Sequence, residues 1–205
     1  MYDQVTTSLR EFYDNQAEER DNSEYPAWKQ LERQQFLTRL QQEGKTSLLE
    51  IGAGPGRDSK FFQDHGLAVI STDLSPEMVK RCQQKGLTAY VMDFLHLDFP
   101  PQSFDAIHAL NCLLHVPTQD LPSVLQTLPG LLKPTGLFYL GVYGGIKHEG
   151  IWPDDPHRPG CFFSYHSDEF MQQITRQFFD LVSFKRISVE RGWVMHFQSI
   201  LLRRH

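Results

Sequence analysis

The sequence predicts an α/β fold, a mostly parallel sheet of seven strands with helices on both faces. From Thr46 onward, short apolar runs alternate with amphipathic runs, which is the pattern of β-α repeats. A glycine-rich turn directly follows the first apolar run and opens a helical segment, as at the ligand-binding edge of such sheets. With 205 residues the chain suffices for one domain of ordinary size but not for two, so we expect a single domain over residues 1–205.

The segment before the first strand, residues 1–45, is expected to form a helical cap. Two polar segments, 7–20 and 28–42, carry apolar residues at helical spacing. The apolar face of the second helix would hold Trp28, Leu31, Phe36, Leu37 and Leu40.

The central segment, residues 46–142, contains the β-α repeats. We expect its strands at 46–51, 67–72, 88–92, 104–110 and 136–143, with helices at 55–65, 76–85 and 118–132. Ser75 can cap the second of these helices, Pro76 fits its first position and Gly86 can end it. Pro129 and Gly130 should bend the third helix or end it early.

The remaining chain is expected to complete the sheet. Residues 143–166 are predicted to be an irregular connection, and connections of this length usually serve as substrate lids or binding loops. Residues 167–205 should hold a helix capped by Ser167 and two final strands, at 179–188 and 193–204.

Composition and charge exclude several classes of protein. The net charge is −5 and no run of Lys and Arg occurs, which argues against a nucleic-acid partner. No apolar stretch reaches the roughly 20 residues that cross a bilayer, and the first residues lack an apolar signal core, so we expect a cytoplasmic protein without a membrane partner. Cys82, Cys112 and Cys161 form no close pair and are expected to be buried apolar residues.

The glycine-rich turn predicts a nucleoside site. Gly52, Gly54 and Gly56 alternate along it, so the backbone can turn sharply and approach a ligand closely at the carboxyl ends of the strands. Asp73 ends the second strand about 20 residues later, where a carboxylate can accept hydrogen bonds from both ribose hydroxyls.

The spacing of this turn favours a nucleoside without phosphates. Counted from Gly52, a dinucleotide motif would place its third glycine at Arg57, whereas here it is Gly56. Pro55 also removes one backbone N–H that a pyrophosphate could use. S-adenosylmethionine fits these features, since it needs the acidic ribose clamp and its sulfonium tail benefits from a carboxylate such as Glu50.

Four motifs then resemble those of the class I S-adenosylmethionine-dependent methyltransferases, of the small-molecule type. They are LLEIGAGPGRDSKFF, STDLSPEMV, VMDFLHLDFPPQSFDAIHALNCLLHVP and LLKPTGLFYL. They occur in the family's order and cover roughly residues 46–143. The resemblance implies a Rossmann-like sheet whose last strand is antiparallel, with residues 46–142 as the cofactor-binding core and S-adenosylhomocysteine as the product.

The resemblance also implies which residues surround the methionine part of the cofactor. The loop beneath it would consist of Glu50, Gly52, Ala53, Gly54 and Gly56.

The adenosine part would contact five further residues. By the same resemblance Asp73 would hold the ribose, and Leu74 and Met78 would flank the adenine. Asp93 would accept a hydrogen bond from the adenine amino group, with the backbone of Phe94 beside it.

The remaining candidates lie nearer the methyl acceptor. The backbone of Asn111 is expected on the methionine side, and Tyr13 resembles an N-terminal aromatic residue that closes over the cofactor. His115, Tyr143 and His166 are the candidate catalytic residues. By the resemblance His115 and Tyr143 fall at the acceptor rim, His166 ends the segment 143–166, and histidine is a natural base near neutral pH.

The function expected from these features is methyl transfer from S-adenosylmethionine to an N or O nucleophile of a small molecule. Alternatives are a non-catalytic module that binds S-adenosylmethionine or S-adenosylhomocysteine, a protein-methylating enzyme and, third, a hydride-transferring oxidoreductase. No metal is expected, since the ligand-type residues between 143 and 166 follow no metal signature. They are His148, Glu149, Asp154, Asp155 and His157. The sequence carries no signal for an oligomeric state.

Overall fold

A computed structural model describes residues 2–189 and 195–205. The described helices are α1 (Tyr2–Asn22), α2 (Ala27–Gln42), α3 (Arg57–Asp64), α4 (Pro76–Gln84), α5 (Leu121–Leu131) and α6 (Asp168–Thr175), with a 3-10 turn, η1 (Leu113–His115). The strands are β1 (Ser47–Ile51), β2 (Ala68–Asp73), β3 (Thr88–Val91), β4 (Phe104–Leu110), β5 (Leu132–Gly144), β6 (His148–Ile151), β7 (Phe162–Tyr165), β8 (Asp180–Ile187) and β9 (His196–Arg203).

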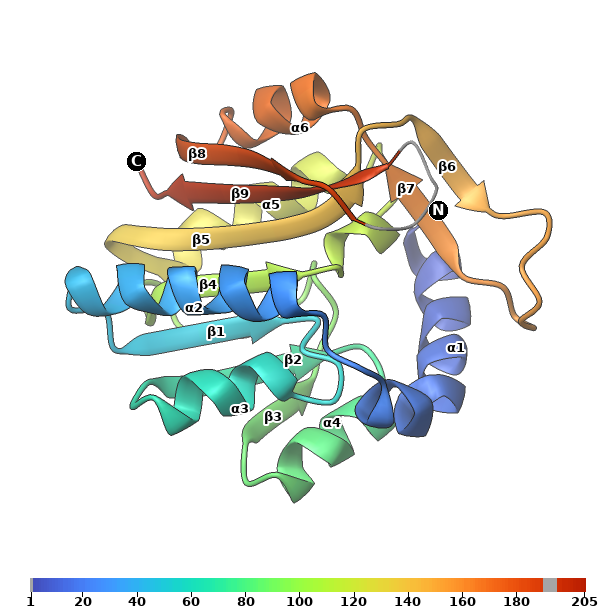
Figure 1. Cartoon of the computed structure of the whole chain (residues 1–205), viewed down its shortest axis with the longest axis horizontal. Coiled ribbons are helices and arrows are strands. Elements are labelled where there is room, and N and C mark those ends of the chain that lie inside the picture. Colours follow the sequence, from blue (N-terminus) through green and yellow to red (C-terminus); the bar gives the residue numbers. More distant parts are fainter. Residues whose placement is uncertain (1, 190–194) are drawn as a thin grey trace.

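The main sheet has seven strands in the order β3-β2-β1-β4-β5-β9-β8 (Figure 1). Strands β1 to β5 pair in parallel, whereas β9 runs antiparallel to both of its neighbours, β5 and β8. The predicted fold class, with its antiparallel last strand, is confirmed. Trp193 and Val194, which the sequence assigned to the last strand, lie outside the described residues.

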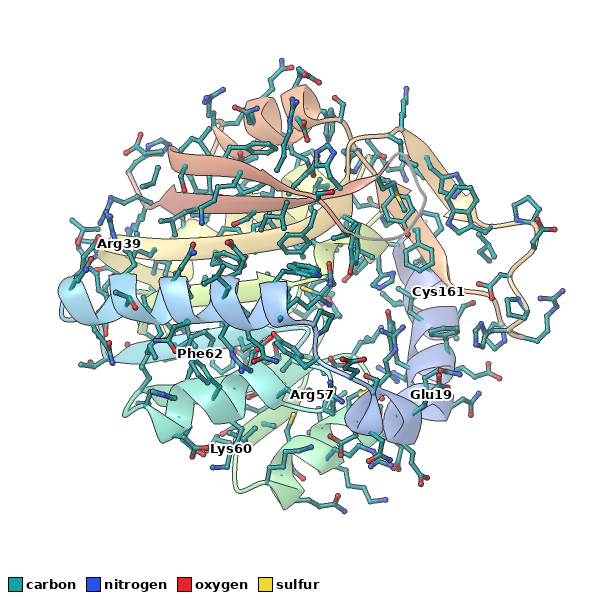
Figure 2. The ribbon with its side chains drawn as sticks, in the orientation of Figure 1. Glu19, Arg39, Arg57, Lys60, Phe62 and Cys161 are labelled. Atoms are coloured by element: carbon teal, nitrogen blue, oxygen red, sulfur yellow. The ribbon has the colours of Figure 1, made fainter. Side chains whose placement is uncertain are left out.

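The sheet is covered on both faces, because alternate residues of each central strand point to opposite sides. Leu48 of β1 packs in a cluster with α2 and α3, whose Phe62 points toward α2 (Figure 2). The next residue, Leu49, packs in a second cluster with α5 and α6. The carboxyl ends of the parallel strands therefore remain free of these covering helices and form one edge of the molecule.

The predicted helical cap is correct in part. Helix α1 lies beside the carboxyl ends of the strands (Figure 1), but α2 lies on the sheet, where Phe36, Leu37 and Leu40 are buried. The expectation for Leu31 was wrong, since it is 57% exposed. Leu31 fits the helical spacing, but the packed face of α2 is too narrow to include it.

The predicted irregular connection over residues 143–166 was also wrong in part. Strands β6 and β7 pair antiparallel within it, from His148 opposite Tyr165 to Ile151 opposite Phe162. A span of only four residues per strand, separated by ten residues, gave the sequence too little alternation to reveal a hairpin. Residues 152–161 between these strands are the part that remains irregular.

Two boundary predictions can be checked directly. Helix α5 ends at Leu131, soon after Pro129, and β5 begins at Leu132 rather than at residue 136. Ser75 accepts a hydrogen bond from the Met78 N–H and so caps α4 as predicted.

The three cysteines are free and buried, as expected. Over the described residues no helix combines the length and apolar character needed to span a bilayer.

Candidate cofactor site

The turn after β1 requires glycine for two physical reasons. Gly52 and Gly54 have φ values of +63° and +55°, in the left-handed region that side chains disfavour. A Cβ atom at Gly52 would also lie 2.3 Å from the Cβ of Cys112, whereas one at Gly54 would have nothing within 4 Å. The backbone of this turn thus approaches the end of β4 on one side and leaves open space above Gly54 on the other.

Asp73 connects this turn to the next strand. One carboxylate oxygen accepts a hydrogen bond from the Gly54 N–H at 2.7 Å, and the other accepts from the Ser75 N–H at 2.9 Å. Burial raises the pKa of Asp73 to about 6. Backbone donors therefore hold the carboxylate in place without a ligand, although burying its charge is unfavourable, as the raised pKa indicates.

A cavity of about 210 Å³ opens beside this turn. Ten of the predicted site residues line it: Tyr13, Gly52, Ala53, Gly54, Asp73, Leu74, Met78, Phe94, Asn111 and His115. Five do not: Glu50, Gly56, Asp93, Tyr143 and His166. The cavity thus brings predicted residues from the ends of four strands and from helix α1 around one space.

Glu50 lies behind the turn, buried in a polar network. It is 2% exposed, and its carboxylate accepts a hydrogen bond from Ser59 and lies 3.1 Å from Nδ1 of His108. Burial raises the pKa of Glu50. Gly56, also absent from the cavity wall, caps α3 with a φ of +82°. Both residues support the turn from beneath.

Glu50, Asp58 and His108 form a group whose ligand atoms lie within 4.8 Å of one another. Such a group could hold a metal ion, but Arg33 already lies 3.0 Å from Asp58. The guanidinium supplies the positive charge that a cation would bring, and Tyr25 donates a second hydrogen bond to the same carboxylate oxygen. The geometry fits a buried hydrogen-bond network better than a metal centre.

The ligand-type residues of the hairpin segment are engaged separately. Asp155 accepts a hydrogen bond from the backbone N–H of His157 at 2.9 Å. His148 stacks on Trp152, with ring centroids 3.8 Å apart, and Glu149 accepts a hydrogen bond from a threonine of the loop before α5. Among the described residues, this set does not gather around a common point.

Asp93 is placed differently from its expected contact with adenine. Its carboxylate accepts hydrogen bonds from the backbone N–H groups of Leu95 and His96, at 2.8 and 3.2 Å, so it caps the turn after β3. Its neighbour Phe94 does line the cavity, and the Phe94 N–H donates to the hydroxyl of Tyr2 at 3.3 Å. A role of Asp93 toward adenine stays a prediction.

Tyr13 and His115 meet across the cavity wall. The Tyr13 hydroxyl lies 2.6 Å from Nε2 of His115, and Nδ1 of His115 lies 2.8 Å from the carbonyl oxygen of Phe162. Burial lowers the pKa of His115 to about 4 and raises the pKa of Tyr13 well above its usual value. His115 is therefore uncharged near neutral pH and ties α1 to the hairpin strand β7.

The other two candidate catalytic residues border a second space of only about 10 Å³. Tyr143 packs edge-on against Trp28 and Phe197, with ring centroids 6.3 and 5.8 Å away. His166 lies 3.1 Å from the Ser164 hydroxyl, and burial lowers its pKa to about 4. These two residues thus border a different space from His115, with which the sequence analysis had placed Tyr143 at one rim.

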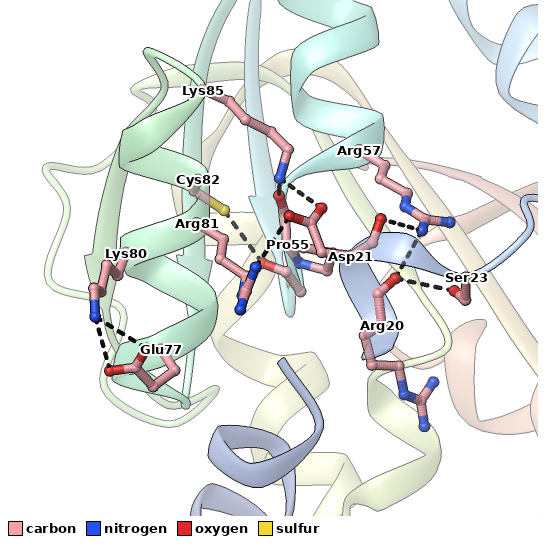
Figure 3. A network of polar contacts seen from close by, with 11 residues as sticks. Arg20, Asp21, Ser23, Pro55, Arg57, Glu77, Lys80, Arg81, Cys82 and Lys85 are labelled. Carbon is pink, nitrogen blue, oxygen red and sulfur yellow. Dashed lines mark hydrogen bonds and ion pairs between the residues drawn. The ribbon is translucent and has the colours of Figure 1, made fainter. Parts of the chain in front are cut away.

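Helix α1 is fastened over the cavity near its middle and at its carboxyl end. Near its middle, Asp14 accepts hydrogen bonds from the Ser75 hydroxyl and from the Glu77 N–H. At its carboxyl end, Asp21 pairs with Lys85 at 2.7 Å and with Arg81 at 3.4 Å (Figure 3).

Arg57 completes this attachment. Its guanidinium donates to the carbonyl oxygens of Arg20 and Asp21, at 2.7 and 2.6 Å, and so satisfies the last carbonyls of α1 (Figure 3). As a result the segment that follows α1 also lines the cavity, including Tyr25 and Pro26. These wall residues could not be predicted from the sequence, because pairs 33 to 64 positions apart hold Tyr25 and the end of α1 in place.

Comparison with known proteins identifies the family of the core. Residues 48–136, which run from β1 into β5, match the family model described as a methyltransferase domain. This part of the chain is therefore similar to methyltransferase domains, as the resemblance to class I S-adenosylmethionine-dependent methyltransferases led us to expect.

Curated relatives match the methyltransferase domain over about half of this chain. A sterol 24-C-methyltransferase of Aspergillus fumigatus is 31% identical over 121 residues, which cover 54% of this chain and 31% of that protein. A demethylmenaquinone methyltransferase of Tropheryma whipplei is 32% identical over 93 residues, covering 43% of this chain and 38% of that protein. The matched region is thus less than half the length of either relative.

Solved structures resemble the whole methyltransferase fold. A 1,6-didemethyltoxoflavin-N1-methyltransferase from Burkholderia thailandensis, solved with its substrate and S-adenosylhomocysteine, has a TM-score of 0.77 at 19% identity and covers 100% of this chain and 90% of that one. A magnesium protoporphyrin IX methyltransferase from Synechocystis has a TM-score of 0.74 at 17% identity, covering 98% and 100%. At these identities the likeness concerns the fold.

Proposed function

We propose that this chain, acting as one domain over residues 1–205, binds S-adenosylmethionine in the cavity and transfers its methyl group to an N or O nucleophile of a small molecule. One observation carries the proposal: a single cavity is lined by the glycine turn, Asp73, Asn111 and His115 from the strand ends and by Tyr13 from helix α1. The residues expected to bind the cofactor and the residues of helix α1 therefore face the same cavity.

The residues present fit the adenosine and methionine parts of this cofactor. The open space above Gly54 lets a ligand approach the backbone, and Asp73 offers a carboxylate at the end of β2. Phe94 and Met78 provide apolar wall for a base. Pro55, in the turn, again disfavours a pyrophosphate.

The chain's own contribution to catalysis would be positioning and exclusion of water. When bound, S-adenosylmethionine would supply a methyl group on a sulfonium sulfur, and a nucleophile in line with the S–C bond would take up the methyl group as the sulfur leaves. Helix α1 and the segment after it close one side of the cavity, and the turn after β1 fixes the opposite side. Holding both reactants in such an enclosure lowers the entropic cost of reaction and limits competition from water.

Two alternatives share the same cofactor site. A non-catalytic module would bind S-adenosylmethionine or S-adenosylhomocysteine without transferring the methyl group, and a protein-methylating enzyme would use a polypeptide acceptor. The small-molecule substrates named for several relatives favour a small acceptor, and the acidic net charge of −5 disfavours nucleic acid. We also propose a cytoplasmic location, as the sequence led us to expect.

Two measurements test the proposed function in sequence. Calorimetric titration should show binding of S-adenosylhomocysteine and none of NAD; the reverse preference would support the oxidoreductase instead. The protein should then be incubated with methyl-labelled cofactor and metabolite extracts, and labelled products identified by mass. A labelled small molecule is expected. Labelled polypeptide alone would favour the protein-methylating enzyme, and binding without any labelled product would favour the non-catalytic module.

A further inference from the structure

The hydrogen bonds of His115 fix where its protons lie. The carbonyl oxygen of Phe162 can only accept, so Nδ1 of His115, at 2.8 Å from it, must carry the ring proton. In the neutral ring Nε2 then has a lone pair, and the Tyr13 hydroxyl at 2.6 Å must donate to it. The direction of both hydrogen bonds follows. The Tyr13 hydroxyl donates to Nε2 of His115, and Nδ1–H of His115 donates to the carbonyl oxygen of Phe162.

This direction leaves hydrogen-bond acceptors on the cavity wall, one of them, at Tyr13, also beside the Cys161 thiol. Because the Tyr13 proton is committed to His115, the hydroxyl oxygen has only lone pairs to offer a ligand. A second acceptor is Oδ1 of Asn111, which is buried and has no partner within residues 2–189 and 195–205. Asn111 and His115 both lie in the short segment after β4, and both line the same cavity as Tyr13.

Asn111 is held in this place by its backbone. Its φ is +53°, and its N–H donates to the carbonyl oxygen of Gly141 at 2.7 Å. A non-glycine residue in the left-handed region is uncommon, and asparagine tolerates it better than most. The neighbouring Cys112 contacts Gly52, so the two acceptors border the glycine turn, where the methionine end of the cofactor is expected.

Building on the proposed methyl transfer, we propose that the acceptor atom is an uncharged nitrogen that carries hydrogen, as in a primary or secondary amine or a ring N–H. Such a group donates a hydrogen bond to Tyr13 or Asn111 and keeps its own lone pair for the methyl group. An alkene carbon or a carboxylate has no hydrogen to donate, and a thiol donates only weakly, so each would leave these buried acceptors unpaired.

The surroundings of His115 also disfavour a hydroxyl acceptor, which must lose its proton to become a good nucleophile. The charged and titratable groups near the ring are Tyr13 and Arg20 on α1 and Cys161 before β7, whose Sγ lies 3.8 Å from Nδ1. Burial lowers the pKa of His115 to about 4, which makes it a weak base. His115 is therefore a positioning residue. It accepts the hydrogen bond of the Tyr13 hydroxyl, so that the lone pairs of that hydroxyl face the methyl acceptor.

An amine needs no base before the reaction. Its lone pair forms the new N–C bond while the sulfonium S–C bond breaks, and the electron pair of that bond remains on sulfur as the thioether. The nitrogen becomes a cation and afterwards releases one proton to water. Atoms and charge balance without a proton acceptor from the protein.

The first test identifies the methylated atom. The protein is incubated with cofactor carrying a ¹³C-methyl group and with metabolite extracts, and the carbon chemical shift of the product distinguishes N-, O-, S- and C-methyl groups. An N-methyl product is expected. An O-, S- or C-methyl product overturns this inference while leaving the proposed function intact. Binding of S-adenosylhomocysteine with no labelled product from any extract contradicts the proposed function itself.

The second test reads the proton positions and needs no acceptor. Nitrogen NMR of the S-adenosylhomocysteine complex should show the His115 ring neutral and protonated on Nδ1 from pH 6 to pH 8. Protonation on Nε2, or an imidazolium at pH 6.5, overturns the inference. Tyr13→Phe keeps the ring and loses the hydroxyl, and should lower kcat on the identified amine at least tenfold with less than threefold change in S-adenosylhomocysteine affinity.

The matched control is Tyr90→Phe, at an exposed tyrosine of β3, which should leave both values unchanged. An equal kcat for Tyr13→Phe and the wild type would show that the hydroxyl does not receive the acceptor's hydrogen, and would overturn the inference even if the product were N-methylated.

Discussion

The two walls of the cavity are built in different ways. On the sheet wall, the turn after β1 and Asp73 are set by local sequence, through left-handed glycines and strand ends that meet at one edge. On the helix wall, Tyr13 and the end of α1 are held by contacts between residues far apart in the chain, such as Asp21 with Lys85. A motif can therefore reveal the first wall, whereas only the folded structure reveals the second.

The two walls should also differ in stiffness. The sheet wall is fixed by backbone hydrogen bonds and by a glycine whose space is limited by Cys112. The helix wall depends on side-chain contacts, among them the partly exposed pair of Asp21 and Lys85, which are 22% and 29% exposed. Pairs of this kind contribute little and are weakened by salt. We infer that α1 is the side that opens to admit ligands.

The largest expected effect breaks the sheet wall. Gly52→Ala should lower the free energy of unfolding by about 3 kcal/mol, because left-handed strain adds to a collision with Cys112. Gly54→Ala carries the same kind of strain but meets open space, so about 1 kcal/mol is expected. Urea unfolding measures both, with Gly44→Ala, also in the left-handed region with nothing within 4 Å, as a remote control. Equal losses for Gly52→Ala and Gly54→Ala would contradict the steric account.

The next effect concerns Asp73 and binding. Asp73→Asn keeps the shape of the side chain but removes the charged acceptor from the ribose, so S-adenosylhomocysteine should bind more weakly by about 2 kcal/mol, roughly 30-fold in Kd. Calorimetry measures this directly. Asp105→Asn is the control, since Asp105 binds Ser47 at the beginning of β1, at the opposite edge of the sheet. An unchanged Kd for Asp73→Asn would remove Asp73 from the site.

The same residue predicts opposite effects of pH on binding and on stability. Because burial raises the pKa of Asp73 to about 6, the ligand-binding carboxylate is lost as pH falls through 6, and wild-type affinity should fall with it. Without ligand, the folded protein holds this proton more tightly than the unfolded chain. The wild type should therefore lose stability relative to Asp73→Asn as pH rises from about 4 to about 6. Parallel pH profiles for the two proteins would contradict this.

The smallest effect loosens the helix wall. Asp21→Asn removes the pairs with Arg81 and Lys85, and should raise the Kd for S-adenosylhomocysteine about twofold, equivalent to about 0.5 kcal/mol. The difference should shrink in 0.5 M salt, because exposed pairs are screened. Asp64→Asn, which removes an exposed pair with Lys60 on α3, should leave affinity unchanged at either salt concentration. A loss of the same size in Asp64→Asn would assign the effect to net charge.

The features that could and could not be predicted from the sequence divide in the same way as the two walls of the cavity. The mostly parallel sheet, the cap at Ser75 and the turn at Gly52 were predictable, since each depends on residues close together or on the general rules of β-α repeats. The hairpin β6–β7 was not, because its short strands are defined by each other rather than by their own pattern. The prediction that Leu31 packs on the apolar face of α2 was wrong, because helical spacing predicts where an apolar face lies but not how wide its buried part is.

Among the site residues, His115 was expected at the acceptor rim, but the residues that surround it could not be predicted from the sequence. Its partners, Tyr13 and the Phe162 carbonyl, lie 102 and 47 positions away, so nothing local indicates that its ring is buried and uncharged. Asp93 shows the converse, since its position after β3 matched a binding role while its carboxylate caps a neighbouring turn.

Hydrogen exchange with and without S-adenosylhomocysteine tests most directly whether the two walls enclose one ligand. Saturating ligand should slow amide exchange both in residues 8–22 of α1 and in residues 52–58 of the glycine turn and the start of α3, whereas NAD should slow neither. Protection confined to one of the two segments, or absent from both, would contradict a shared cofactor cavity.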